Sequence, residues 1–283
     1  MKVVGCGDNI VDRFIDRRIT YPGGNCVNFA VFASQLGAES HYVGAFGSDP
    51  HGDHIRAALT AEGVRLDHSV VREGVSGVTD ITVVDGERVF GGWNGGGVSC
   101  EHPRRVDDTV SDFLRDARVV HSSVYSRLEA ELPRMRGRDT LVSYDLSSEP
   151  EYRTSEYLDL VCPHIDLALI SASEVSEADT ITLMRRVVDA GSGAALATRG
   201  TAGSFLLWDG SIHRGEAEVV DAAAVRDTMG CGDAFVTAFV VALLRDGWTR
   251  TLRPHPAAAL AFAASFAARQ VQVEGAFGHG VAY

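Results

Sequence analysis

The sequence predicts an α/β fold in which a mainly parallel sheet is covered by helices, and two observations carry this prediction. Short β-branched or apolar runs alternate with segments of helical periodicity almost from end to end of the 283 residues. Parallel strands need long crossover connections, usually helices, so this alternation is typical of a parallel sheet. The composition agrees, because 45% hydrophobic and 23% charged residues are ordinary for a globular protein.

The elements of this pattern can be placed in order along the chain. The first four are expected as strand, helix, strand and helix: Lys2–Cys6, Asn25–Leu36, His41–Phe46 and Gly52–Glu62. After a gap, four more apolar runs are expected as strands: Arg118–Ser122, Thr140–Tyr144, Leu167–Ser171 and Ala194–Thr198. A helix over Ser176–Ala190 should connect the last two of them.

The last third of the chain departs from the parallel pattern. Asp209-Gly210 predicts a hairpin turn between strands at Ser204–Trp208 and Ser211–His213. Two apolar helices should follow, at about Gly232–Leu244 and Pro256–Gln270.

A second hairpin interrupts the rhythm earlier in the chain. Thr79–Val84 and Glu87–Gly92 read as two strands around Asp85-Gly86, before the glycine-rich Asn94–Gly97. Because a two-residue turn cannot join parallel strands, this hairpin should project from the main sheet. We expect residues 1–283 to form one domain, with residues 75–100 as an inserted β-hairpin lid. An edge hairpin on the main sheet is the alternative.

Charge excludes some classes of protein. With 26 Lys and Arg against 38 Asp and Glu, the net charge is −12, which gives no basic surface for nucleic acid or for an anionic membrane. Asp8 interrupts any secretion signal and no run reaches about 20 apolar residues, so a cytoplasmic location is expected. The five cysteines form no C-x-x-C pair, which indicates reduced thiols without a zinc site.

A glycine turn before an apolar helix carries the clearest chemistry: Asp227-Thr228-Met229-Gly230-Cys231-Gly232-Asp233. The glycines let the backbone approach a ligand, and the first amides of the helix favour a phosphate. A carboxylate beside a phosphate is repelled, unless Asp233 takes the proton from a hydroxyl that attacks the phosphoryl group. Asp233 as a helix cap after ordinary glycines is the alternative.

These residues resemble the second signature of the ribokinase family of carbohydrate kinases, the phosphofructokinase B-type group. The first signature is also matched, by Gly23-Gly24-Asn25-Cys26-Val27-Asn28-Phe29-Ala30. The resemblance implies a ribokinase-like three-layer α/β/α fold with a small β lid, and ATP-dependent phosphorylation of a sugar. It makes Asp233 the catalytic base, with the phosphoryl group stabilised by the amides of Gly230, Cys231 and Gly232.

The resemblance also implies the binding residues. The positions that contact the sugar in the family are matched by Asp8, Asp12, Gly23, Gly24, Asn25 and Asn28. Turn and cap roles are the alternative, above all for Asn25. Thr198, Gly200 and Gly203 match a T-x-G-x-x-G loop beside the ATP phosphates, with Asp227 and Thr228 on the nucleotide side as well. Glu174 would bind Mg²⁺ through water, although Ser171 replaces the usual asparagine, and K⁺ is a further candidate.

Local features resemble one branch of the family, the fructoselysine 6-kinases. They include Gly7-Asp8-Asn9-Ile10-Val11-Asp12, Arg88-Val89-Phe90-Gly91 and Met229. This branch implies phosphorylation of the 6-hydroxyl of a fructosamine, with pocket positions at Arg88, Phe90, His121 and Tyr125, and a polar position at Asp145. A free sugar (fructose or ribose), a nucleoside and a non-catalytic sugar- or nucleotide-binding regulator are the alternatives. Apolar side chains on the lid, among them Val89 and Phe90, would suit a homodimer.

Overall fold

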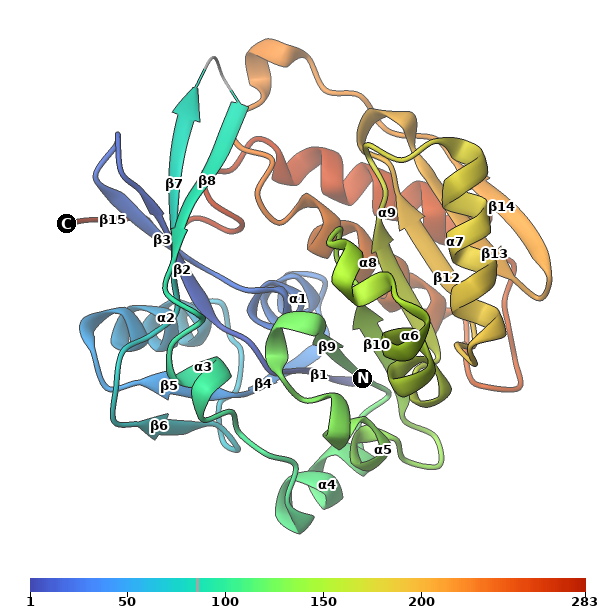
Figure 1. Ribbon diagram of the computed structural model, residues 1–283, viewed down its shortest axis with the longest axis horizontal. Helices are drawn as coiled ribbons and strands as arrows, with labels where there is room; N and C mark the ends of the chain where they lie inside the picture. The colour runs from blue at the N-terminus through green and yellow to red at the C-terminus, as the bar shows by residue number, and fades with distance from the viewer. Residues whose placement is uncertain (85–86) are drawn as a thin grey trace.

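The computed structural model describes residues 1–84 and 87–283, and of residues 83, 84, 87 and 88 it describes the backbone alone. Its main sheet has eight strands in the order β14-β13-β12-β11-β10-β9-β1-β4 (Figure 1). The pairings from β12 to β4 are parallel, and those of β13 with its two neighbours are antiparallel. The bounds, in that order, are Ser211–Gly215, Ser204–Trp208, Ala195–Thr198, Leu167–Ser171, Leu141–Asp145, Val119–Ser123, Lys2–Cys6 and Glu39–Val43.

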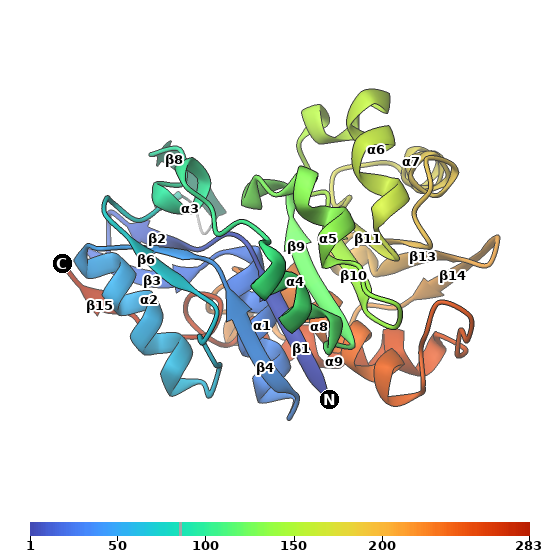
Figure 2. The same cartoon turned by 90° about the horizontal axis from the view of Figure 1, so that it is seen from below.

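Helices cover both faces of this sheet, as predicted. Successive strand residues point to opposite faces, so Val3 packs with the helices of one layer and Val4 with those of the other. Figure 2 shows α5, α6 and α7 on one side of the sheet and α1 and α9 on the other. The first layer is α4 (Asp108–Arg115), α5 (Leu132–Met135), α6 (Ser155–Val161) and α7 (Glu177–Asp189); the second is α1 (Asn25–Gln35), α2 (Pro50–Ala61), α8 (Cys231–Arg245) and α9 (Ala257–Gln270).

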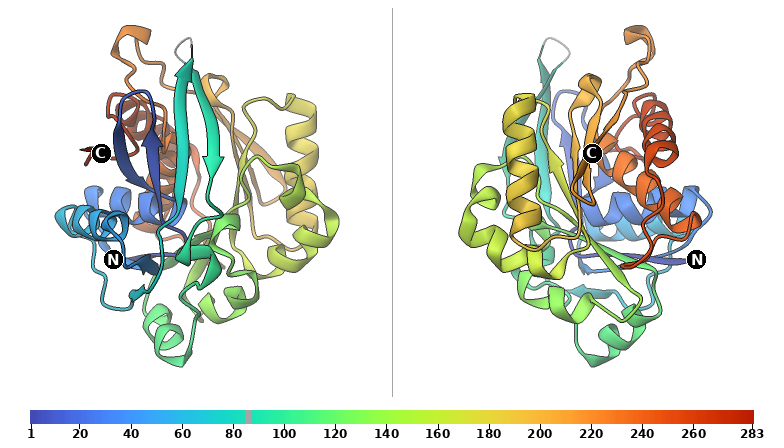
Figure 3. Two further views of the ribbon diagram at one scale, coloured as in Figure 1. Left: turned by 60° about the vertical axis from the view of Figure 1, so that its left-hand side comes forward. Right: turned by 90° about the vertical axis from the view of Figure 1, so that its right-hand side faces the viewer.

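A second sheet of five strands holds the lid, in the order β15-β3-β2-β7-β8. Its hairpin, β7 (Val78–Val84) and β8 (Glu87–Trp93), is present as predicted and lies off the main sheet. Figure 3 shows this hairpin beside β2 (Ile10–Phe14) and β3 (Ile19–Gly23), and β7 pairs in parallel with β2. The lid sheet is therefore larger than residues 75–100, and also includes the C-terminal β15 (Val281–Ala282).

Two predictions of local structure were wrong. The hairpin β2–β3 was not predicted, because Asp12 interrupts its first strand and Pro22-Gly23 its second. The single strand expected over His41–Phe46 is divided at Gly44 into β4 and β5 (Ala45–Gly47), and β5 pairs with β6 (Val70–Arg72) in a separate two-stranded sheet. The remaining elements that were predicted lie within two residues of their expected bounds.

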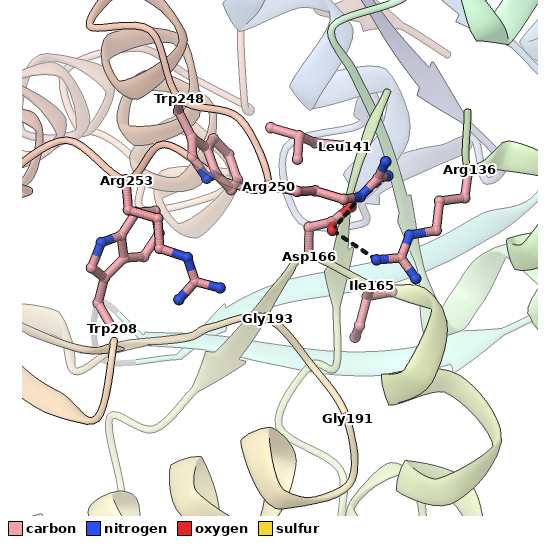
Figure 4. Close-up of a pocket in the computed structure, with 10 residues that line it drawn as sticks. All are labelled: Arg136, Leu141, Ile165, Asp166, Gly191, Gly193, Trp208, Trp248, Arg250 and Arg253. Carbon is pink, nitrogen blue, oxygen red and sulfur yellow. Dashed lines mark hydrogen bonds and ion pairs between the residues drawn. The ribbon is translucent and has the colours of Figure 1, made fainter. Parts of the chain in front are cut away.

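An ion-pair cluster around the buried Asp166 lies at the amino end of the parallel strands, beside a cavity of about 150 Å³. Asp166 precedes β11 there and accepts hydrogen bonds from Arg250 Nε at 2.9 Å and Arg136 Nη2 at 3.2 Å (Figure 4). Its other oxygen accepts the Val142 amide at 2.8 Å. Arg250 also donates to three main-chain carbonyls, those of Gly137 and Arg138, both at 2.8 Å, and that of Thr140. These ion pairs and hydrogen bonds connect the loops that contain Arg136, Asp166 and Arg250.

Within the described part of the chain, no helix has the length and apolar character needed to cross a membrane. All five cysteines are free thiols.

Candidate active site

A cavity of about 640 Å³ lies at the carboxyl ends of the parallel strands and is lined by many of the predicted residues. That volume is in the range of small-molecule sites, and this edge of an open α/β sheet is where such sites occur. Its walls come from the ends of β1, β10 and β11, the first turns of α1 and α8, and the lid strand β8.

The first turn of α8 forms one wall. Gly230 has φ +71°, and a Cβ there would lie 2.7 Å from the Ala276 Cβ, so this position requires glycine. A Cβ on Gly232 would meet no atom within 4 Å and would instead occupy the cavity. The amide of Cys231 donates to the Thr228 carbonyl at 3.3 Å. The amides of Gly232 and Asp233 lie in the first turn of α8, where a helix supplies no acceptor, so they could bind an anion.

Asp233 is 7% exposed and is held by two amides of α1. Asn28 Nδ2 donates to its Oδ2 at 2.7 Å, and Asn25 Nδ2 to its Oδ1 at 3.1 Å. Asn25 Nδ2 also donates to Asp145 Oδ2 at 2.8 Å, so one amide group links two carboxylates. This excludes the cap role for Asn25, because Gly24 is the N-cap of α1.

The two linked carboxylates have raised pKa values. Burial is the main cause for Asp233, whose pKa lies well above its usual value, and the charge of Asp145 adds to the effect. Burial likewise raises the pKa of Asp145 to about 7, although the Ser147 amide, which donates to Asp145 at 2.7 Å, opposes the shift. Asp233 is therefore prepared to accept and hold a proton.

Two further carboxylates line the cavity on the side of the lid sheet. Asp8 follows β1 and accepts hydrogen bonds from Ser123 Oγ at 2.8 Å and Ser126 Oγ at 2.9 Å. Asp12 lies on β2 and is 6% exposed. A Cβ on Gly24 would approach Asp8 Oδ2 to 2.9 Å, and one on Gly23 would approach Asp12 Oδ2 to 2.8 Å. The two glycines thus make room for the carboxylates, and of the pair only Gly24 lines the cavity.

The other predicted acceptor positions have different outcomes. Phe90 lines the cavity from β8 and is 62% exposed, whereas the side chain of Arg88 lies outside the described residues. The prediction that His121 lies in the acceptor pocket is not met, because His121 does not line the cavity. Its side chain is fully buried and stacks on Phe29 with ring centroids 4.5 Å apart, and burial lowers its pKa to about 3. Every residue of β9 is buried, so this side chain packs in the helical layer beneath the sheet.

The predicted nucleotide residues lie along the same edge of the sheet but mostly outside this cavity. Thr198 ends β12, and Gly200 and Gly203 form the tight turn into β13. Glu174 is exposed after β11. Thr228 lines the cavity, as does Ser171, which replaces the usual asparagine.

Asp227 has a supporting position. Its carboxylate accepts the amide of Met229 at 3.0 Å and the amide of Gly275 at 3.1 Å. It therefore joins the glycine turn to the C-terminal segment, and it does not line the cavity.

Several lining residues were missed from the sequence. Glu149, Glu151 and Tyr152 follow β10, and Trp93 lies beside Phe90 on the lid. The available signal was a cluster of polar residues directly after a buried strand, where parallel sheets place their sites. Tyr125 and Asp145, which were named from the sequence, do line the cavity.

Comparison with known proteins finds relatives over the full length of the chain. Residues 16–278 match the pfkB family carbohydrate kinase profile. Fructosamine kinase FrlD of Bacillus subtilis (strain 168) is 34% identical, over 100% of this chain and 95% of that protein. Fructoselysine 6-kinase of Escherichia coli (strain K12) is 29% identical, over 96% of this chain and 97% of that protein.

Solved structures share the fold. The fructokinase of Xylella fastidiosa with bound ATP superposes with a TM-score of 0.82, at 20% identity over 98% of this chain and 94% of that one. Aminoimidazole riboside kinase of Salmonella enterica, complexed with aminoimidazole riboside and an ATP analogue, gives a TM-score of 0.78, at 22% identity over 99% and 96%. The ribokinase-like fold expected from the sequence is thereby confirmed.

Proposed function

The chain belongs to the pfkB family of carbohydrate kinases, and from this premise we propose that it transfers the γ-phosphate of ATP to the 6-hydroxyl of a fructosamine such as fructoselysine. The names of two full-length relatives, a fructosamine kinase and a fructoselysine 6-kinase, support this acceptor. The single observation that carries the reaction is the position of Asp233, buried at the amino end of α8 and aligned by Asn25 and Asn28 within the cavity.

The chemistry follows from that position. Asp233 takes the proton of the acceptor hydroxyl while the hydroxyl oxygen bonds to the γ-phosphorus of ATP. The bond from that phosphorus to the oxygen that bridges it to the β-phosphorus breaks, which releases ADP. The amides of the first turn of α8 stabilise the charge on the transferring group. The acceptor would be held by Asp8, Asp12 and the backbone at Gly24, which line the same cavity.

ATP would lie along the carboxyl ends of β11 and β12, beside Thr198, Gly200, Gly203 and Thr228. Mg²⁺ bound to the phosphates of ATP would neutralise their charge, and Glu174 would bind this ion through a water molecule. The donor chemistry fits, because Mg²⁺ is commonly held by one or two carboxylates together with the phosphates of the substrate. K⁺ remains a prediction of the sequence to which no residue is assigned.

The surroundings of the enzyme are part of the same proposal. We place it in the cytoplasm, where ATP is available, and propose a homodimer that pairs through the lid. Val89 on β8 is 48% exposed, which supports such a contact. Phe90 and Trp93 line the cavity, so their exposure does not by itself indicate a dimer interface.

A free sugar is the second candidate acceptor, because the fructokinase of Salmonella typhimurium is also a relative, 27% identical over 87% of this chain and 85% of that protein. The test is ATP consumption by the purified protein with fructoselysine, fructose, ribose and a nucleoside, each with and without Mg²⁺. We expect Mg²⁺-dependent turnover that is fastest with fructoselysine, and a product that carries the phosphate on carbon 6 by NMR. Turnover that is fastest with a free sugar would replace the acceptor, and binding without turnover would point to a regulator.

A further inference from the structure

The charge of the acceptor cavity is one-sided. Among the described residues that line it, no Lys or Arg occurs, while its carboxylates come from β1, β2, the loop after β10 and α8. These are Asp8, Asp12, Asp145, Glu149, Glu151 and Asp233. Such a wall repels an anionic acceptor such as a sugar phosphate and attracts a cationic one.

Asp145 is one of the buried carboxylates of this wall that have only neutral hydrogen-bond donors. It is 4% exposed, and its donors are the Asn25 amide and the backbone of Ser147. Among the described residues, no Lys or Arg forms an ion pair with it. Buried carboxylates are usually paired with a cation, so Asp145 adds to the attraction of the cavity for a cationic ligand.

Glu149 continues the wall along the same loop and is held in place. Tyr125 donates its hydroxyl to Glu149 Oε1 at 2.6 Å, and Ser148 donates its amide to Oε2 at 3.2 Å. Burial raises the pKa of Glu149, but the hydrogen bonds from Ser147 and Tyr125 outweigh it, so the pKa lies below its usual value and the group is charged at neutral pH.

Aromatic rings flank this carboxylate. Tyr125 and Tyr152 meet edge to face with their centroids 6.2 Å apart, and both line the cavity. Phe90 and Trp93 line it from the lid strand β8. Carboxylates together with aromatic faces recognise organic ammonium groups, through ion pairing and cation–π attraction.

We infer that Glu149 binds the protonated amine of the acceptor and thereby selects a fructosamine over a free sugar. The inference rests on the proposed function, since it places the 6-hydroxyl at Asp233. The amine is attached to carbon 1, at the other end of the sugar. Asp145 ends β10 beside Asp233, whereas Glu149 lies four residues further along the loop that follows β10 and also lines the cavity.

The test is the ratio of kcat/KM for fructoselysine to kcat/KM for fructose in Glu149→Gln. Glutamine keeps an acceptor for the Tyr125 hydroxyl, so the variant removes the charge with little change in shape. We expect the ratio to fall at least tenfold, mainly through the KM for fructoselysine. Asp145→Asn, which changes a carboxylate beside Asp233, should lower kcat/KM for both acceptors and leave the ratio near its wild-type value. Glu156→Gln, which removes an exposed charge on α6, is the matched control that changes neither quantity. Where fructose turnover is too slow to measure, the ratio of the calorimetric Kd values for the two acceptors is compared between the variants instead.

Three results would overturn the inference. The ratio could stay at its wild-type value in Glu149→Gln. The loss could be equal for the two acceptors, as a purely structural role predicts. The variants could instead raise the Mg²⁺ concentration needed with either acceptor, which would make the wall a metal site. A wild-type protein that phosphorylates fructose but no fructosamine would overturn the proposed acceptor as well, and is recognised before any variant is made.

Discussion

The two ends of the main sheet treat a buried aspartate in opposite ways. At the amino end, Asp166 is 8% exposed and is paired with Arg250 and Arg136, with the Val142 amide on its second oxygen. At the carboxyl end, Asp145 is 4% exposed and has only neutral donors. At the amino end, arginines of the chain neutralise the charge of Asp166. At the carboxyl end, no cation of the described chain forms an ion pair with Asp145.

This difference separates structural from functional burial. A buried carboxylate without a cation either holds a proton or, when charged, lowers the free energy of unfolding, and proteins accept such a cost at functional sites. Asp145 is linked through the Asn25 amide to Asp233, so the cost is concentrated at the proposed site of phosphoryl transfer. The predictions below test whether the two ends really differ in this way.

The largest effect is expected for Asp233→Asn. Without a base, kcat should fall by about 10²–10⁴-fold, while affinity for the acceptor is largely kept because asparagine has the same shape. Steady-state kinetics and calorimetric binding measure the two quantities. Asp246→Asn, at the exposed other end of α8, is the control. Near-normal turnover by Asp233→Asn would remove Asp233 from its role.

Asp166→Ala should act on stability. It leaves two arginines without their carboxylate and the Val142 amide without its acceptor, which we expect to cost about 3–5 kcal/mol of unfolding free energy. Urea unfolding measures this loss, and kcat of the folded protein should stay near its wild-type value. Asp159→Ala on α6 removes an exposed carboxylate as a control. A loss no larger than that of the control would mean that the cluster does not hold the fold.

Substitutions of the two glycines of the α8 turn should affect stability and activity separately, with smaller effects than those of Asp166→Ala and Asp233→Asn. Gly230→Ala places a Cβ 2.7 Å from Ala276 on a backbone with φ +71°, so stability should fall by about 1–2 kcal/mol. Gly232→Ala meets no atom within 4 Å but enters the cavity, so it should lower kcat and leave the melting temperature unchanged. Equal melting temperatures with equal activities for the two variants would contradict this division.

The pH dependence should carry the smallest and most specific effect. Asp233 must be unprotonated to act as a base, so kcat/KM should rise with pH through an apparent pKa above the usual range of an aspartate. Because the linked carboxylates titrate as a pair, this pKa belongs to both. Asp145→Asn removes the neighbouring negative charge and should move the rising limb to lower pH. A limb that stays in place would mean that the charge of Asp145 does not act on Asp233.

Much of the fold and the core of the site could be predicted from the sequence. The alternation of strands and helices fixed most elements of the main sheet, because period and turn residues are local signals. The glycine turn before α8 and the residues around Asn25 identified the cavity, since both motifs line it.

The missed features depend on contacts between distant segments. The pairing of β2 with β7 enlarges the lid sheet and cannot be inferred from a strand interrupted by Asp12. His121 was placed at the sugar from the resemblance to the fructoselysine 6-kinases and its position at a predicted strand end, yet it packs on Phe29 of α1. The amide of Asn25 reaches carboxylates 120 and 208 residues away, so its role became visible only with the fold.

The most direct test of the contrast is to measure the unfolding free energy and kcat/KM for fructoselysine of Asp145→Asn and Asp166→Asn together, at pH 8. The raised pKa of Asp145 means that the folded state holds this proton more tightly than the unfolded chain does. Its contribution to stability is therefore present at low pH and is lost as pH rises from about 4 through about 7, by about 1.4 kcal/mol for each unit between the two pKa values.

At pH 8 the account predicts that Asp145→Asn unfolds with a free energy equal to or above that of the wild type and has a reduced kcat/KM. It predicts that Asp166→Asn loses stability and keeps its kcat/KM. Two variants that lose stability alike, or an Asp145→Asn protein that is less stable and fully active, would contradict it.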